Sequence, residues 1–172
     1  ILHWDLWDGS LPAFGPAAAG AKMTVFGGGA PVDDEADAWQ AALATFRRFD
    51  EADRLLFSVP MWNAGIPYVL KQLIDVISQP GTVFDVDART GYRPLLAGRG
   101  KKAAVIYTSA VWGPQLGPEF GRNFQSTYFN DWLTWIGVDD ISEVRFHPTL
   151  LGDWPAERLS AQAVAREVAK TF

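Results

Sequence analysis

The most constraining feature of this sequence is a pair of short apolar runs, each followed by a turn and then by a helical pattern. Residues 55–59 are Leu-Leu-Phe-Ser-Val before Pro60, and residues 103–108 form a second run that leads into a loop of Ala, Val, Trp, Gly and Pro. Short continuous apolar runs are typical of strands buried in a parallel sheet. The sequence therefore predicts an α/β fold, a doubly wound parallel sheet with helices on both faces.

The remaining segments fit this alternation of strands and helices. Apolar residues recur at helical spacing from Ile66 to Ile77, with Pro67 in the first turn. Residues 82–99 carry Gly, Pro and alternating residues, which predicts a hairpin. The other predicted elements are an edge strand at 1–7, a surface loop at 9–30, helices at 33–50, 119–136 and 156–170, and a strand at 143–147. No linker or repeat divides them, so we expect one domain over residues 1–172.

The composition excludes several classes of function. The 172 residues include 15 Lys and Arg against 20 Asp and Glu, a net charge of −5. Nucleic-acid-binding domains usually show a basic stripe, whereas the adjacent basic pairs here are Arg47-Arg48 and Lys101-Lys102, so no nucleic-acid partner is expected. No apolar stretch approaches the roughly 20 residues that cross a bilayer, so no membrane association is expected. Cysteine is absent, which excludes disulfides, thiolate metal sites and a cysteine nucleophile and suits a cytoplasmic protein. No convincing cluster of metal ligands is found either, so no metal site is expected.

Two loops are the candidate binding site. In doubly wound sheets ligands bind beyond the carboxyl ends of the strands, which here places residues 60–65 and 108–114 together. Trp62 and Trp112 lie in these loops, where an aromatic ring suits a planar ligand, although either ring could instead serve a core or an interface. Asn63 either contacts the ligand or only stabilises its turn.

Sequence motifs in the same region carry a family resemblance. They extend in order over residues 55–151: Pro60-Met61-Trp62-Asn63, Gly65-Ile66-Pro67, Leu70-Lys71, Ile74-Asp75, Gln79-Pro80-Gly81-Thr82, Phe84, Gly98, Lys101-Lys102, Thr108-Ser109, Gly117-Pro118, Phe124-Gln125-Ser126, Trp132, Ile136-Gly137 and Pro148-Thr149-Leu150. Together they resemble the FMN-dependent NAD(P)H azoreductase and quinone oxidoreductase family.

This resemblance implies a flavodoxin-like fold that binds FMN non-covalently. The implied activity is ping-pong transfer of two electrons from NADH or NADPH to quinones or azo compounds, in a homodimer with active sites at the subunit interface. No catalytic side chain is expected, because flavin N5 carries the hydride. The implied FMN-binding residues are Pro60, Met61, Trp62, Asn63, Ala64, Thr108, Ser109, Ala110, Val111 and Trp112, and the implied substrate-pocket residues are Trp135, Val86 and Trp112.

The sequence also departs from the family pattern. The usual aromatic after Met-Trp-Asn is Ala64, which should thin one pocket wall, and Ala110 and Val111 stand where glycine is more common. The family's first strand and its phosphate-binding loop are not found, and residues 27–29 are interpreted as a plain loop. We therefore hypothesise that the chain is a portion of a longer protein.

Rival interpretations remain at this stage. A flavodoxin-type electron carrier would bind FMN without small-molecule turnover, and a truncated relic would bind no flavin. The aromatic stripe of Phe120, Phe124 and Tyr128 is expected in the core or on a dimer surface rather than in the pocket. His147, at the end of a predicted strand, is expected to be structural.

Overall fold

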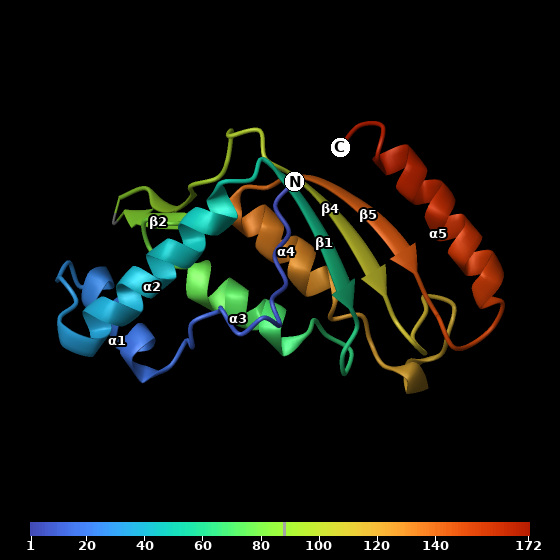
Figure 1. Cartoon of the computed structure of the whole chain (residues 1–172), viewed down its shortest axis with the longest axis horizontal. Coiled ribbons are helices and arrows are strands. Elements are labelled where there is room, and N and C mark those ends of the chain that lie inside the picture. The colour runs from blue at the N-terminus through green and yellow to red at the C-terminus, as the bar shows by residue number, and fades with distance from the viewer. Residues whose placement is uncertain (88) are drawn as a thin grey trace. The chain divides into compact units, whose positions relative to one another are not determined.

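The computed structural model describes residues 1–87 and 89–172 and divides into two compact units (Figure 1). The first, which we call the helical unit, comprises Ile1–Asp53 and Tyr68–Arg99. The second, the sheet unit, comprises Arg54–Pro67 and Gly100–Phe172. The expectation of one domain over the whole chain stays a prediction.

The sheet unit is built on three parallel strands in the order β1-β4-β5. Their bounds are Arg54–Pro60 for β1, Lys102–Thr108 for β4 and Asp140–Phe146 for β5. The register sets Pro60 opposite Thr108, so β1 and β4 end at the same level of the sheet. The predicted parallel α/β arrangement is confirmed, and the two loops of the candidate site leave the sheet side by side.

Helices cover both faces of this sheet because side chains alternate along each strand. On one face α4 (Ser126–Ile136) sets the buried ring of Phe129 edge-on to Phe57 of β1, with 4.9 Å between centroids. On the other face Val144 of β5 is buried, and α5 (Trp154–Val168) packs along β5 (Figure 1). Leu56, on the edge strand β1, is 65% exposed.

The described residues of the helical unit form three helices and a hairpin. Its elements are α1 (Pro16–Phe26), α2 (Asp33–Asp50), α3 (Tyr68–Ile77), β2 (Phe84–Asp87) and β3 (Gly91–Pro94). Helix α2 packs against α1 and α3, and β2 pairs antiparallel with β3. The predicted helices at 33–50 and 66–77 and the predicted hairpin are confirmed, although residue 88, inside the hairpin segment, lies outside the described residues.

Two predictions at the N-terminal end are wrong. Residues 1–7 form no strand; instead the Trp4 ring packs under the Arg48 guanidinium, 4.1 Å from its centroid, and the Trp7 ring packs edge-on against Tyr68. The alternation of apolar residues there does not lead to sheet pairing, and Leu2 is 72% exposed. The predicted loop at 9–30 contains α1, because Pro16 starts a helix and the alanines after it favour one.

The long helix predicted at 119–136 is shorter in the structure. A 3-10 turn, η1 (Pro118–Phe120), is followed by Gly121 at φ +87°, a left-handed conformation that ends the turn. Helix α4 begins at Ser126 and ends, as predicted, before Gly137, which adopts φ +96°. The segment between Gly121 and Ser126 is therefore not helical and does not continue the axis of α4.

Candidate functional site

The first wall of the site is the turn that follows β1. Trp62 and Gly65 exchange two backbone hydrogen bonds of 2.9 Å, which closes a two-residue turn around Asn63 and Ala64. Both central residues have positive φ, +49° for Asn63 and +69° for Ala64. That is the geometry of a type I′ turn, in which the second position usually prefers glycine. The turn is closed by its own backbone and carries strain at Ala64.

The second wall is the turn that follows β4. The Ser109 hydroxyl donates to the carbonyl of Trp112 and closes the turn. Behind it, the Thr149 N–H donates to the Ser109 carbonyl at 2.9 Å, and the Leu150 N–H donates to the Ala110 carbonyl at 2.9 Å. Residues 149 and 150 follow β5, so this turn is held by a segment distant in sequence.

A cavity of about 280 Å³ lies between these two turns. Its lining residues are Met61, Asn63, Ala64, Ser109, Ala110, Val111, Trp112 and Phe120. The structure therefore brings together seven of the residues singled out in the sequence and adds Phe120, which we had expected in the core or on a dimer surface. In the sequence, Phe120 lies between Gly117-Pro118 and Gly121, which together signal a turn. This turn signal is what could have separated Phe120 from the helix predicted there.

The other predicted site residues lie outside this lining. Pro60 and Thr108 are the last residues of β1 and β4, and the Trp62 side chain is 43% exposed. Trp135 is at the far end of α4 from Phe120 and is 37% exposed, and Val86 belongs to the helical unit and is 52% exposed. Their assigned roles in binding stay predictions.

The cavity walls offer backbone donors. The N–H groups of Asn63, Ala64, Ala110, Val111 and Trp112 make no hydrogen bond among the described residues. The Asn63 side-chain amide likewise has no partner within the described part of the chain. None of the eight lining residues is ionisable at neutral pH. The site is thus an uncharged slot with polar donors from both turns and apolar surface from Met61 and Phe120.

One titratable group lies directly behind this slot. The His147 ring meets the Trp112 ring edge-on at 5.2 Å between centroids. Both imidazole nitrogens are buried and have no hydrogen-bond partner among the residues described. Burial lowers the pKa of His147 below its ordinary value, and the nearby Arg145 charge lowers it further. The imidazole therefore favours its neutral form, which suits a structural role behind Trp112.

The described residues offer neither a candidate metal site nor a helix able to span a membrane. They contain no group of three or more His, Cys, Asp or Glu side chains arranged to hold a metal ion. None of the helices described has the length and apolar character needed to cross a membrane.

The chain is similar in sequence and in fold to known proteins. The chain is 46% identical over 155 residues to the FMN-dependent NADH:quinone oxidoreductase of Ruegeria pomeroyi, a match that covers 90% of this chain and 75% of that protein. An azoreductase of Bacillus anthracis str. Sterne has a similar solved structure, with a TM-score of 0.81 and 24% identity over 99% of this chain and 80% of that one.

A second solved structure, the FMN-dependent NADH-azoreductase of Bacillus anthracis str. Ames Ancestor in complex with FMN, also has a TM-score of 0.81, with 20% identity over 98% of this chain and 79% of that one. These two likenesses concern the fold. The family model described as a flavodoxin-like fold matches residues 1–170, which confirms the fold predicted from the sequence. The chain belongs to this flavodoxin-like family, to which its residues and its parallel sheet both point.

Proposed function

We propose that this protein is an FMN-dependent NADH:quinone oxidoreductase that also accepts azo compounds. The observation that carries the proposal is the uncharged cavity between the turns after β1 and β4, with unpaired donors on both walls. Family membership and the printed names of the relatives support the same activity. The relative's name gives NADH as the electron donor.

The residues of the cavity fit the isoalloxazine ring of FMN. This ring is flat, with an apolar dimethylbenzene end and a pyrimidine end that carries donors and acceptors. The N–H groups of Ala110, Val111 and Trp112 suit the acceptors of the pyrimidine edge, and the Asn63 amide offers both a donor and an acceptor. Met61 and Phe120 provide apolar surface for the body of the ring. Polar and apolar groups are thus divided as the ring requires.

In this proposal the protein binds and orients, and the redox chemistry is that of the cofactor. Bound FMN supplies two-electron transfer between donor and acceptor, so no side chain is assigned a catalytic role. The proposed FMN-binding residues are Pro60, Met61, Trp62, Asn63, Ala64, Thr108, Ser109, Ala110, Val111 and Trp112. With FMN held there, the two turns would shield one face of the ring from water, and Trp112 would limit access of the acceptor.

The quaternary state and location follow the same proposal. A homodimer with its sites at the interface would allow Trp135, which does not line the cavity, and Val86 to contribute to a substrate pocket. Light scattering should then give twice the mass of the chain, and Trp135→Leu should raise KM for the quinone without changing FMN affinity. We place the protein in the cytoplasm, with no nucleic-acid or membrane partner.

The direct test combines spectroscopy and turnover. The purified protein, supplied with FMN, should show flavin absorption at about 370 and 450 nm after removal of free FMN. It should then oxidise NADH when benzoquinone is added. Retention of FMN without turnover would identify a flavodoxin-type electron carrier instead. The same test is made with lumiflavin, which is the flavin ring without the phosphate. A protein that retains neither FMN nor lumiflavin would refute the proposal.

A further inference from the structure

A buried glutamine connects the two strands from which the site is built. Gln125 is 1% exposed and lies immediately before α4. Its side-chain Nε2 donates to the Val59 carbonyl at 2.7 Å and to the Thr108 carbonyl at 3.1 Å. These acceptors lie 66 and 17 residues away in sequence. One amide group therefore spans the carboxyl ends of β1 and β4.

The two carbonyls stand at the bases of the two walls of the cavity. Val59 is separated from Met61 by Pro60 alone, and Thr108 directly precedes Ser109. The Thr108 carbonyl also accepts the Met61 N–H at 2.7 Å, so it receives donors from the first turn and from Gln125. Any change in the position of the Gln125 amide would thus be passed to both turns at once.

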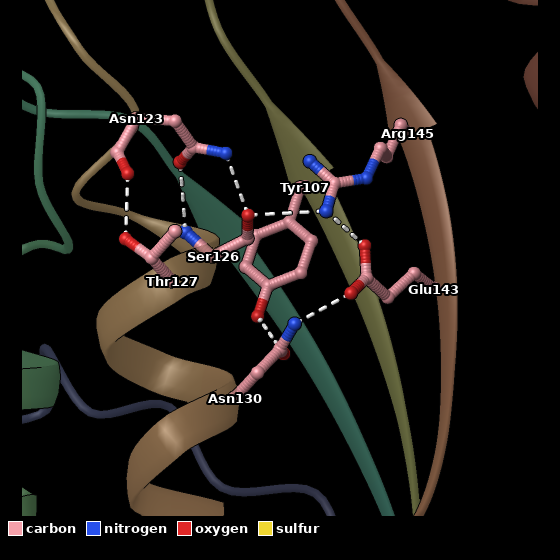
Figure 2. Close-up of polar contacts among 7 residues, drawn as sticks. All are labelled: Tyr107, Asn123, Ser126, Thr127, Asn130, Glu143 and Arg145. Atoms are coloured by element: carbon pink, nitrogen blue, oxygen red, sulfur yellow. Dashed lines mark hydrogen bonds and ion pairs between the residues drawn. The ribbon is translucent and has the colours of Figure 1, made fainter.

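The backbone around Gln125 is fixed by a capping arrangement (Figure 2). The Asn123 side chain accepts the Ser126 N–H at 3.0 Å and donates to the Ser126 hydroxyl at 2.7 Å. The Thr127 hydroxyl donates to the Asn123 carbonyl at 2.6 Å. The Asn123 side chain thus satisfies the Ser126 N–H, which the helix itself leaves unpaired, and the three bonds together enclose Gln125 within a closed turn.

The first turns of α4 are also tied to the sheet by side chains (Figure 2). The buried Tyr107 hydroxyl donates to Asn130 Oδ1 at 2.7 Å, and Asn130 Nδ2 donates to Glu143 at 2.5 Å. Arg145 forms an ion pair with Glu143 and donates to the Ser126 hydroxyl at 3.1 Å. Burial raises the pKa of the Tyr107 hydroxyl, which keeps it protonated as a donor. The helix start has little freedom to move relative to β4 and β5.

From this geometry we infer that Gln125 is a positioning residue that fixes the spacing of the two turns and thereby the width of the slot for the flavin ring. It does not line the cavity, and it acts through Val59 and Thr108. The inference rests on the proposed function, because it names the residue that sets the geometry of that same site.

The helical unit contains a matched control. Gln79 is also 1% exposed, and its Nε2 donates to the carbonyls of Asp75 and Val76 at 2.7 and 3.0 Å. Both acceptors are in α3, which ends two residues before Gln79, and they lie four and three residues back in sequence. Gln125→Met and Gln79→Met therefore remove the same kind of buried contact with little change in side-chain length, but only the first contact joins the walls of the site.

The test measures dissociation constants for lumiflavin and FMN by quenching of flavin fluorescence, with each variant corrected for its folded fraction. Loss of the bridge should raise the lumiflavin dissociation constant of Gln125→Met about tenfold, which corresponds to about 1.4 kcal/mol of binding free energy. Gln79→Met should bind with the wild-type constant. Equal lumiflavin constants in Gln125→Met and wild type would overturn the inference alone. Wild-type protein that binds neither flavin would overturn the proposed function and the inference with it.

A second variant serves if Gln125→Met does not fold. The Gln125→Glu side chain keeps the shape of glutamine, but its carboxyl donates a hydrogen bond only when it is protonated. The ratio of the lumiflavin affinity of Gln125→Glu to that of wild type, measured at the same pH, should therefore rise toward one as the pH is lowered. An affinity ratio that stays constant with pH would count against a hydrogen-bonded bridge and overturn the inference.

Discussion

The two turns that enclose the cavity are stabilised in different ways. The turn at 61–65 closes on itself through the paired hydrogen bonds of Trp62 and Gly65 and holds Ala64 in a strained conformation. The turn at 109–113 depends on the Ser109 hydroxyl and on Thr149 and Leu150, which follow β5. The first is closed mainly by its own backbone, with one long-range bond from the Phe124 N–H to the Ala64 carbonyl at 2.9 Å, whereas the second depends chiefly on contacts with residues distant in sequence. Changes behind the second turn should therefore reach the site more readily than changes within the first.

The largest difference is expected between the glycines of the two turns. A Cβ on Gly113 would lie 3.2 Å from Pro148 Cδ, whereas a Cβ on Gly65 would meet only the Trp62 carbonyl oxygen at 3.8 Å. Gly113→Ala should lower the free energy of unfolding by about 1–3 kcal/mol because the backing segment must shift. Gly65→Ala should change it by less than about 0.5 kcal/mol. Urea unfolding of both variants checks this, and equal losses would remove the distinction between the turns.

A smaller loss is expected from the hydroxyl that closes the second turn. Ser109 is 4% exposed, and Ser109→Ala removes its bond to the Trp112 carbonyl. The free energy of unfolding should fall by about 1 kcal/mol, the net value of a typical hydrogen bond. Ser58→Ala, at an exposed position of β1 in the same unit, is the control and should cost only a few tenths of that (about 0.3 kcal/mol). Indistinguishable midpoints in denaturant would show that backbone bonds alone hold this turn.

The first turn should respond in the opposite direction. Ala64 has φ +69°, which costs a residue with a Cβ about 1 kcal/mol. Ala64→Gly should therefore raise the free energy of unfolding by roughly 0.5–1 kcal/mol, a gain reduced by the greater entropy of glycine in the unfolded chain. Ala163→Gly, at an exposed position inside α5, should lower it by about the same amount. Destabilisation by both changes would show that Ala64 is not strained.

The smallest effect is expected from pH, and it should act through the second turn alone. The pKa of His147 is lowered in the folded protein, mainly by burial, so below about pH 6.5 the unfolded chain takes up the proton more readily. The contribution of His147 to stability is present above that pH and is lost as the pH falls through the folded-state pKa. The free energy of unfolding, measured at pH 7.5 and at pH 5, should differ less between the two pH values in His147→Gln than in wild type.

The exposed His3 supplies the control for this experiment, since His3→Gln leaves the contacts of the second turn unchanged. An identical pH dependence in wild type and His147→Gln would contradict the prediction. A steeper dependence in the variant would mean that the folded state favours the protonated imidazole.

Local sequence patterns were sufficient for much of the fold. The apolar run at residues 55–59, the helical spacing from Ile66 to Ile77 and the turn signals in 82–99 each depend on neighbours within a few residues. The pattern failed at residues 1–7, where Trp4 and Trp7 pack against Arg48 and Tyr68 rather than in a sheet. Apolar alternation alone does not establish a strand: within this segment Leu2 is 72% exposed and Trp7 is 52% exposed.

In the candidate site, too, some features follow from the sequence alone and others only from the tertiary structure. The sequence by itself determined which two turns follow the parallel strands, because a parallel sheet brings the carboxyl ends of its strands to one edge. The tertiary structure decided that Phe120 faces the cavity, that residues 147–150 support the second turn, and that Gln125 bridges β1 and β4. These contacts join residues far apart in the chain, and their formation depends on the packing of side chains in three dimensions, which no local periodicity encodes.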